Sequence, residues 1–347
     1  MNNYETLMKR CFELAAMGEG AVSPNPLVGC VVLNKDGDVI SEGYHHKYGC
    51  NHAERDALLK LHNGEESGGT LIVNLEPCSH FGKTPPCTDL IIDRGIARVV
   101  IGMRDVNPKV DGIKKLQDAG IEVISGVLED EARKLNEVFI KNMKQHKTFI
   151  AIKTATTLDG KIATSNGSSK WITSEPAREE VKVIRNRYDA ILTSSSTVIA
   201  DNPTMAHRKK VILDRNLCTE LNSKFYQDGE IYVFCSGKNG VEKNITFMDT
   251  PVISGKLDLE FILNKLYELG IYSVLVEAGG HLNGSFLPFA DKIYHFIAPK
   301  ITNDNSSLSA FDSEVIDDIN RSKLFKFDSV KAFSPDVLLT YYPMDNK

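Results

Sequence analysis

Short apolar runs alternate with amphipathic runs along most of the chain, and this alternation constrains the fold more than any other feature. Residues 97–103 and 273–276 are mostly apolar over the length of a buried strand. Residues 53–62 and 259–270 instead repeat apolar side chains at helical spacing. A chain that alternates strands with helices packs into layered α/β sheets. We therefore predict an α/β fold.

The first half of the chain predicts a helix near the N-terminus, a hairpin and then alternating elements. Leu7, Cys11 and Leu14 lie at helical spacing in the first segment. Residues 85–95 begin with proline and end with glycine, which is the polarity expected of a helix. The expected elements are a hairpin over 27–45 with its turn at 35–37, helices over 53–62, 85–95, 113–120 and 129–145, and strands over 70–77, 97–103 and 121–127.

A polar, basic segment at 141–149 separates this set of elements from a second one. We place the domain boundary there, with domains over 1–146 and 147–347, because a chain of 347 residues suits two domains. No repeat relates the halves, so two different chemistries are expected. The second half predicts helices over 178–189 and 259–270, strands over 149–155, 190–195, 210–214 and 230–236, and a strand that runs into glycines over 273–280.

Charge and composition exclude several classes of protein. The formal net charge of −5 disfavours nucleic acid as the main partner, because phosphate neutralisation requires a basic face. No run approaches the roughly 20 apolar residues of a membrane span. Charged residues interrupt the N-terminal segment, which is therefore not expected to be a signal peptide. Seven cysteines, an odd number in a long chain, disfavour a disulfide framework and favour a cytoplasmic protein with reduced thiols.

Four residues in the first half carry a metal-site pattern. His52 and Glu54 stand at the expected start of a helix, Cys78 follows a strand, and Cys87 opens the next helix. One histidine and two thiolates supply three zinc ligands and leave a fourth position open for water, as in catalytic zinc sites. The His-x-Glu set followed by Pro-Cys is the zinc deaminase signature, in which the glutamate carries protons without binding the metal.

The spacing of the two cysteines leaves alternatives open. Zinc-binding cysteine pairs usually lie about two to four residues apart, whereas residues 79–86 separate Cys78 from Cys87. Taken alone, the two could be buried thiols. A disulfide is disfavoured by the expected compartment. The presence of His52 and Glu54 upstream favours zinc.

The segments "SPNPLVGCVV", "GYHHKYGCNHAE", "LEPCSHFGKTPPCTDLII" and "GMRDVNP" resemble the deaminase half of the bifunctional riboflavin-biosynthesis deaminase–reductases. That half is similar to cytidine and tRNA-adenosine deaminases. The resemblance implies a cytidine-deaminase-like domain in which His52, Cys78 and Cys87 bind one zinc ion and Glu54 is the catalytic proton shuttle. It also implies substrate contacts from Asn25, His80 and Lys83, although Lys83 could equally be a solvated surface lysine. His45 and His46 are expected to be structural or surface residues.

The segments "FIAIKTATTLDGKIAT", "AILTSSSTVIADNPTMAHR" and "LVEAGGHLNGSFL" resemble the reductase half of the same family, so the resemblance covers most of the chain. It implies a dihydrofolate-reductase-like α/β domain that uses NADPH. The glycines at the expected strand-to-helix turn would admit a phosphate to free helix amides. The implied cofactor positions are Ala155, Trp171, Thr197, Asp201, Gly279, Gly280, His281, Leu282, Asn283, Gly284 and Ser285. The implied substrate positions are Ser169, Arg185, Met205, Arg208 and Glu277. Lys153 stands inside an apolar strand, where a buried lysine is costly, and a role at the active site would explain it.

The resemblance therefore predicts a bifunctional enzyme of riboflavin biosynthesis that first deaminates 2,5-diamino-6-(5-phosphoribosylamino)pyrimidin-4-one at zinc. It then reduces the ribosyl group of the product to a ribityl chain with NADPH. The alternatives are a tRNA deaminase with an accessory domain, a zinc-stabilised binding module, or a chain with only one active half. The loops after Pro108 and Arg208 are shorter than the family pattern. The expected partner is a small phosphorylated pyrimidine, and a homo-oligomer, dimer or tetramer, remains open.

Overall fold

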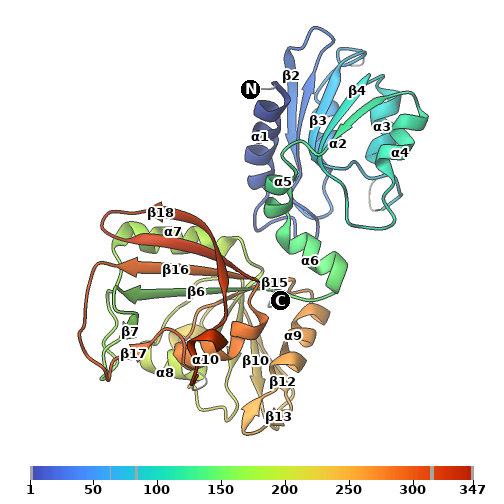
Figure 1. The fold of residues 1–347 in the computed structure, drawn as a ribbon. Helices are drawn as coiled ribbons and strands as arrows, with labels where there is room; N and C mark the ends of the chain where they lie inside the picture. Colours follow the sequence, from blue (N-terminus) through green and yellow to red (C-terminus); the bar gives the residue numbers. More distant parts are fainter. Residues whose placement is uncertain (1–2, 63, 83–84, 313–315, 345–347) are drawn as a thin grey trace. The chain divides into compact units, whose positions relative to one another are not determined.

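The computed structural model describes residues 3–62, 64–82, 85–312 and 316–344 and divides the chain into two compact units, Met1–His146 and Lys147–Lys347. Both units have mixed α/β architecture (Figure 1). No helix among the described residues is long and apolar enough to cross a membrane. All seven cysteines are free thiols.

The first unit is a five-stranded sheet between two layers of helices, with strand order β2-β1-β3-β4-β5. The strand β1 pairs antiparallel with β2 and β3, and β3, β4 and β5 run parallel. In Figure 1, α1 and α5 cover one face, and α2, α3 and α4 lie on the other. The elements are α1 (Asn3–Ala16), β1 (Gly29–Leu33), β2 (Val39–Tyr44), α2 (Ala53–Leu58), β3 (Thr70–Leu75), α3 (Cys87–Asp93), β4 (Arg98–Met103), α4 (Gly112–Asp118), β5 (Glu122–Ser125), α5 (Glu129–Leu135) and α6 (Glu137–Gln145).

Two apolar clusters hold this sheet between its helices. Met8, Cys11 and Leu14 of α1 pack against one face of the central strands. On the other face, Ala53, Ala57 and Leu58 of α2 and Ile91 of α3 belong to a second cluster of fully buried side chains. The central strands β1, β3 and β4 are almost entirely buried because helices cover both of their faces.

The expectation of one closing helix over 129–145 is wrong. The structure has two helices, α5 and α6, separated at Asn136, whose φ of −105° and ψ of 21° depart from helical values. The Asn136 side chain bonds to the backbone of Leu27. A short polar side chain that binds backbone elsewhere competes with continued helix. The predicted hairpin, with β1 and β2 joined through Gly37, is confirmed.

The second unit is built on a ten-stranded sheet in the order β11-β12-β10-β9-β8-β15-β6-β16-β19-β18. The strands from β12 to β16 in this order run parallel, and β11, β19 and β18 are antiparallel to their neighbours. Two small sheets, β13-β14 and β17-β7, accompany it. The strands of the second unit are β6 (Phe149–Thr157), β7 (Lys161–Ala163), β8 (Ala190–Ser194), β9 (Lys209–Leu213), β10 (Glu230–Cys235), β11 (Gly240–Glu242), β12 (Ile245–Asp249), β13 (Val252–Ile253), β14 (Lys256–Leu257), β15 (Ser273–Val276), β16 (Lys292–Ala298), β17 (Leu308–Ser309), β18 (Phe325–Ala332) and β19 (Val337–Pro343).

The α-helices of this unit follow strands of its parallel sheet or connect them. They are α7 (Glu175–Asn186), α8 (Ser195–Asp201), α9 (Leu259–Glu268) and α10 (Gly280–Phe286), with short 3-10 turns η1 (Lys224–Tyr226), η2 (Leu287–Phe289) and η3 (Ile319–Arg321). Because β15 pairs in parallel with both β6 and β8, the carboxyl ends of these three strands meet at one edge of the sheet. Ligands of open α/β sheets bind at this kind of edge.

Candidate functional site: a metal centre and a buried charge cluster

The predicted zinc ligands come together in the first unit. His52 caps the N-terminus of α2, Cys78 follows the end of β3, and Cys87 is the first residue of α3. The Nδ1 atom of His52 lies 3.5 Å from each cysteine Sγ. The ligand atoms of these three residues all lie within 4.8 Å of one another. Among the described residues, they form the group of side chains that could hold a metal ion.

The environment of the two thiols favours thiolate at Cys78. The backbone N–H of Cys87 donates to Cys78 Sγ over 3.3 Å. The pKa of Cys78 is lowered to about 4, chiefly by a hydrogen bond from the Cys87 side chain and further by His52. Burial acts in the opposite direction but is outweighed. The thiolate is the form that binds metal. One imidazole and two sulfur ligands therefore fit zinc with one position left open.

Glu54 is buried next to this cluster in the first turn of α2, with 3% of its surface exposed. Its Oε2 atom has no hydrogen-bond partner among the described residues. Burial raises the pKa of Glu54 to about 6. A carboxyl group with a pKa near the operating pH can both accept and release a proton. A buried carboxylate oxygen without a partner also suits a site that is completed by a ligand.

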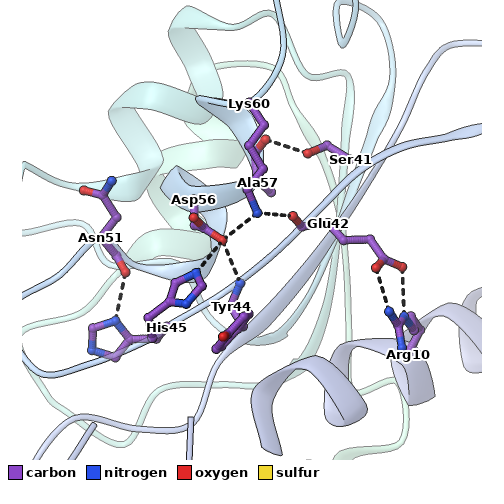
Figure 2. A network of polar contacts seen from close by, with 10 residues as sticks. Arg10, Ser41, Glu42, Tyr44, His45, Asn51, Asp56, Ala57 and Lys60 are labelled. Atoms are coloured by element: carbon purple, nitrogen blue, oxygen red, sulfur yellow. Dashed lines mark hydrogen bonds and ion pairs between the residues drawn. The ribbon is translucent and has the colours of Figure 1, made fainter. Parts of the chain in front are cut away.

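A polar network fixes α2 against β2 and so positions His52 and Glu54 (Figure 2). The Asp56 carboxylate accepts hydrogen bonds from the backbone of Tyr44, from Lys60 and from His46. The Ser41 hydroxyl donates to a backbone carbonyl of α2 over 2.7 Å. Close packing accompanies this network, because a Cβ on Gly43 would lie 2.5 Å from α2 backbone atoms.

A cavity of about 330 Å³ opens beside the metal centre. His52, Glu54 and Cys78 line it together with the predicted substrate residues Asn25 and His80. Its size is that of a small-molecule site. The predicted substrate residue Lys83 lies outside the described residues. The remaining lining includes Gly82, Asp105, Asn107, Val110, Phe139 and Met143.

His45, expected to be structural or a surface residue, lies in this cavity and is 2% exposed. Its Nδ1–H donates to the Asn51 carbonyl over 2.8 Å, which leaves Nε2 to accept from the Asn25 amide at 3.1 Å (Figure 2 shows the Asn51 contact). Burial lowers the pKa of His45 and favours this neutral form. Its place two residues past Gly43 is a weak signal in the sequence, because a lone histidine has many structural uses.

In the second unit, three predicted substrate residues form a buried charge cluster. Glu277 follows β15 directly and is 7% exposed. Its carboxylate accepts hydrogen bonds from Arg185 Nε at 2.6 Å and Nη2 at 3.0 Å, and Lys153 Nζ lies 3.4 Å away. Lys153 is on β6, the strand that pairs with β15, so the sheet register places it beside Glu277. Glu277 thus supplies the counter-charge that a lysine in a largely apolar strand requires.

The glycine turn after β15 has the features that a phosphate requires. Gly279 is the N-cap of α10, and no described side chain caps that helix. A Cβ on Gly279 would meet no atom within 4 Å, so the space beside these amides is open. A Cβ on Gly280 would lie 2.2 Å from the Ser309 carbonyl oxygen, so Gly280 is required for packing. Residues 281–285 continue α10, with Asn283 fully buried and bonded to Ala310. This turn fits a nucleotide phosphate.

The other predicted positions of the second unit are spread over several segments. Trp171 is 63% exposed and lies under the guanidinium of Arg178, 4.5 Å from its ring centre. Met205 is buried in an apolar cluster, so packing already accounts for it. Arg208 is exposed. Ala155 lies on β6, Thr197 and Asp201 lie on α8, and Ser169 lies in the segment before Trp171.

Comparison with known proteins identifies both units. Residues 1–103 match the cytidine and deoxycytidylate deaminase zinc-binding region, and residues 148–339 match the RibD C-terminal domain. The riboflavin biosynthesis protein RibD of Actinobacillus pleuropneumoniae is 38% identical over 98% of this chain and 96% of its own length. The chain belongs to the RibD family. It is therefore a bifunctional enzyme of riboflavin biosynthesis, with a zinc-binding deaminase domain of the cytidine deaminase type and a reductase domain that uses NADPH.

Solved RibD structures share the whole fold. A diaminohydroxyphosphoribosylaminopyrimidine deaminase/5-amino-6-(5-phosphoribosylamino)uracil reductase of Thermotoga maritima superposes with a TM-score of 0.90 at 42% identity, over 98% of this chain and 99% of that one. RibD of Acinetobacter baumannii gives a TM-score of 0.87 at 32% identity, over 99% of each chain. The similarity thus spans both domains of the RibD family at full length.

Proposed function

We propose that residues 1–146 deaminate 2,5-diamino-6-(5-phosphoribosylamino)pyrimidin-4-one and that residues 147–347 reduce the ribosyl group of the product with NADPH. The observation that carries the first step is the His52, Cys78 and Cys87 cluster beside the buried Glu54, at the wall of a cavity of small-molecule size. The Thermotoga maritima relative bears the names of both activities. The division of labour follows the two family matches.

His52, Cys78 and Cys87 would hold the zinc ion. Zinc in such a site lowers the pKa of bound water to about 7 and so supplies a nucleophile at neutral pH. The hydrogen bond from the Cys87 amide stabilises the Cys78 thiolate in readiness for the metal. The N-cap position of His52 on α2 sets its ring against both sulfur atoms.

Glu54 moves the proton in this proposal. Its buried carboxylate accepts a proton as water adds to the amine-bearing ring carbon, and returns it to the leaving nitrogen. The carbon–nitrogen bond breaks, ammonia leaves, and the water oxygen remains as the ring carbonyl. The raised pKa of about 6 supports this role, because a group that titrates near neutrality can act in both directions.

The cavity wall orients the pyrimidine. His45 accepts from the Asn25 amide nitrogen, which turns the amide so that its carbonyl oxygen can accept from a ring amine of the substrate. His80 lies on the segment between the two cysteines and lines the same cavity. We assign Asn25 and His80 to substrate binding on this basis, with Lys83 proposed from its place in the same segment.

The second unit binds NADPH and the ribosyl phosphate across the carboxyl ends of its parallel strands. NADPH, when bound, would supply the hydride for ribosyl C1′, with cleavage of the C1′–O4′ bond and protonation of O4′. Gly279 and the amides of α10 are proposed to bind a cofactor phosphate. Lys153 and Arg185, fixed by Glu277, present positive charge at the adjacent strand ends. The remaining proposed contacts are Ala155, Trp171, Thr197, Asp201 and residues 280–285 for the cofactor, and Ser169, Met205 and Arg208 for the substrate.

Compartment and partners complete the proposal. Free thiols at all seven cysteines support a cytoplasmic location. The proposed partner is a phosphorylated pyrimidine. We also propose that the chain forms a homo-oligomer, and light scattering would measure its mass.

Incubation with the proposed substrate tests both steps. The chain is given the diaminopyrimidine phosphate with and without NADPH, and the products are identified by mass spectrometry. Without NADPH we expect ammonia and the deaminated ribosyl compound, and with NADPH the ribityl compound. Prior removal of zinc by a chelator should abolish the first product yet leave reduction of pre-deaminated substrate intact. Release of ammonia from tRNA but not from the pyrimidine would overturn the proposal.

A further inference from the structure

Asn136, which separates the last two helices of the first unit, contacts the loop over residues 24–28 that lines the cavity. Asn136 is 3% exposed and separates α5 from α6. Its Oδ1 accepts from the Leu27 N–H over 2.8 Å, and its Nδ2 donates to the Leu27 carbonyl over 3.0 Å. The side chain thus pairs with both backbone groups of one residue, as a neighbouring strand would.

A second buried amide completes the same anchor. Asn74 on β3 donates to the Leu27 carbonyl over 2.9 Å, and its Oδ1 accepts from the Gly29 N–H over 2.8 Å. The Leu27 carbonyl therefore accepts two hydrogen bonds, which uses both of its lone pairs. Leu27 precedes the first residue of β1, so side chains here supply the bonds that a strand partner supplies further along.

The loop held by these amides forms a wall of the cavity. Pro24, Asn25, Pro26 and Val28 all line it, and they flank the anchored Leu27. Asn25 is in turn held by His45. A shift of the Leu27 backbone would therefore move Asn25 relative to the metal centre.

The helix that starts after Asn136 contributes to the same cavity. Phe139 and Met143 of α6 line it, one turn apart on one side of the helix. Both lie beyond residue 103, where the match to the general deaminase zinc-binding region ends. The cavity of this chain is thus completed by a segment outside that region. Apolar side chains of this kind suit the face of a planar ring.

We propose that Asn136 is a positioning residue of the deaminase site. It holds the Asn25 loop at a set distance from the metal centre through Leu27, and it sets the start of α6 so that Phe139 and Met143 form an apolar wall for the pyrimidine ring. This inference rests on the proposed function, in which Asn25 contacts the substrate.

The test compares Asn136→Ala with Asn142→Ala in the full-length, zinc-loaded chain. Asn142 is also a buried asparagine, on α6 itself, so it controls for a general loss of stability. We expect Asn136→Ala to raise the KM of deamination by about tenfold, because the Asn25 loop loses both hydrogen bonds that hold Leu27 to Asn136. Zinc content, and the KM for reduction of pre-deaminated substrate, should stay at wild-type values.

Two further variants separate the steps of the argument. Asn136→Asp keeps the acceptor for the Leu27 N–H but sets a carboxylate oxygen against the Leu27 carbonyl oxygen, so its KM should be at least as high as that of Asn136→Ala. Phe139→Ala should raise the same KM while the Asn25 loop stays anchored. Because Asn136 acts through Asn25, the two substitutions should not be additive. The double variant Asn25→Ala/Asn136→Ala should weaken substrate binding by less than the sum of the two single effects.

The outcomes distinguish this inference from the proposed function. If Asn25→Ala leaves the KM of deamination unchanged, the proposed substrate contact is wrong. If Asn25→Ala raises the KM but Asn136→Ala leaves it within twofold of wild type, the positioning role is wrong. Equal loss of zinc, deamination and thermal stability in the Asn136 and Asn142 variants would also overturn it, because both residues would then be merely structural.

Discussion

Arg185 and Glu277 are joined by two hydrogen bonds, 2.6 and 3.0 Å long, between α7 and the end of β15. Because two donors of the guanidinium group bind Glu277, fewer donors of Arg185 remain for a phosphate. Lys153 adds a second cation on the adjacent strand. The carboxylate thus holds two positive charges at the strand ends where a phosphorylated substrate is proposed to bind.

Replacing Glu277 with glutamine should abolish reduction and destabilise the second unit by about 3 kcal/mol, because two partly buried cations lose their counter-charge. Deamination and zinc content should remain. Urea unfolding followed by the fluorescence of Trp171, the only tryptophan, measures the stability of this unit. Loss of deamination in a variant that still binds zinc would contradict the separation of the two activities.

The same carboxyl group predicts a pH dependence. Burial alone would raise the pKa of Glu277, but Lys153 and Arg185 outweigh it and lower the pKa from 4.5 to about 2. The charged form is therefore favoured by folding, and its stabilisation is complete above pH 4.5 and is lost as the pH falls towards 2. Wild type should lose more stability than Glu277→Gln between pH 5 and 2.5. Parallel unfolding curves for the two proteins over that range would show that the carboxyl group is not paired in solution.

Replacing Glu54 with alanine should lower kcat of deamination by roughly 10² to 10⁴-fold, the usual contribution of a positioned acid–base group. Zinc should stay bound, because the ligand atoms come from His52, Cys78 and Cys87. Metal analysis of the purified variant and an ammonia assay check both parts. Reduction of pre-deaminated substrate serves as the control. Simultaneous loss of zinc would mean that Glu54 helps to bind the metal.

The two glycines before α10 should respond differently to alanine. A Cβ at position 279 meets open space, so Gly279→Ala should fold normally and weaken NADPH binding by obstructing the approach of a phosphate. A Cβ at position 280 would lie 2.2 Å from the Ser309 carbonyl, so Gly280→Ala should lower the melting temperature. Calorimetric titration with NADPH and thermal unfolding distinguish the two effects. Unchanged NADPH affinity in Gly279→Ala would show that no cofactor phosphate binds at this turn.

Lys210 should stabilise the second unit mainly through backbone carbonyls. It is fully buried on β9, where its ammonium group donates to the carbonyls of Phe225 at 2.5 Å and Thr204 at 3.3 Å and pairs with Asp228. Lys210→Met should cost about 2 kcal/mol, because these carbonyls lose their donor. Asp228 is 57% exposed, and Asp228→Asn keeps an amide oxygen that can accept from the ammonium group, so it should cost less than Lys210→Met. Equal costs in urea unfolding would indicate that the ion pair dominates.

The sequence predicted the elements that have a strong local pattern. The hairpin at Gly37, the helix after His52 and the helix that begins at Cys87 are confirmed, because periodicity, turn glycine and helix-start proline are local signals. The continuous helix over 129–145 was wrong, since Asn136 makes its preferred bonds with a residue far away in sequence. The antiparallel strands β18 and β19, at the edge of the large sheet, were not predicted either, because their half-exposed pattern is weak.

What the sequence determined by itself was the chemistry of the site: one histidine, two cysteines and a glutamate in the His-x-Glu and Pro-Cys pattern of zinc deaminases, and a chain divided between two kinds of α/β domain. What only the tertiary structure decided was how that chemistry is held in place. The bonds of His45 to Asn25, of Asn136 to Leu27 and of Arg185 to Glu277 join residues far apart along the chain. Such contacts have no local pattern, because they depend on which strands lie side by side and on which polar groups burial leaves in need of a partner.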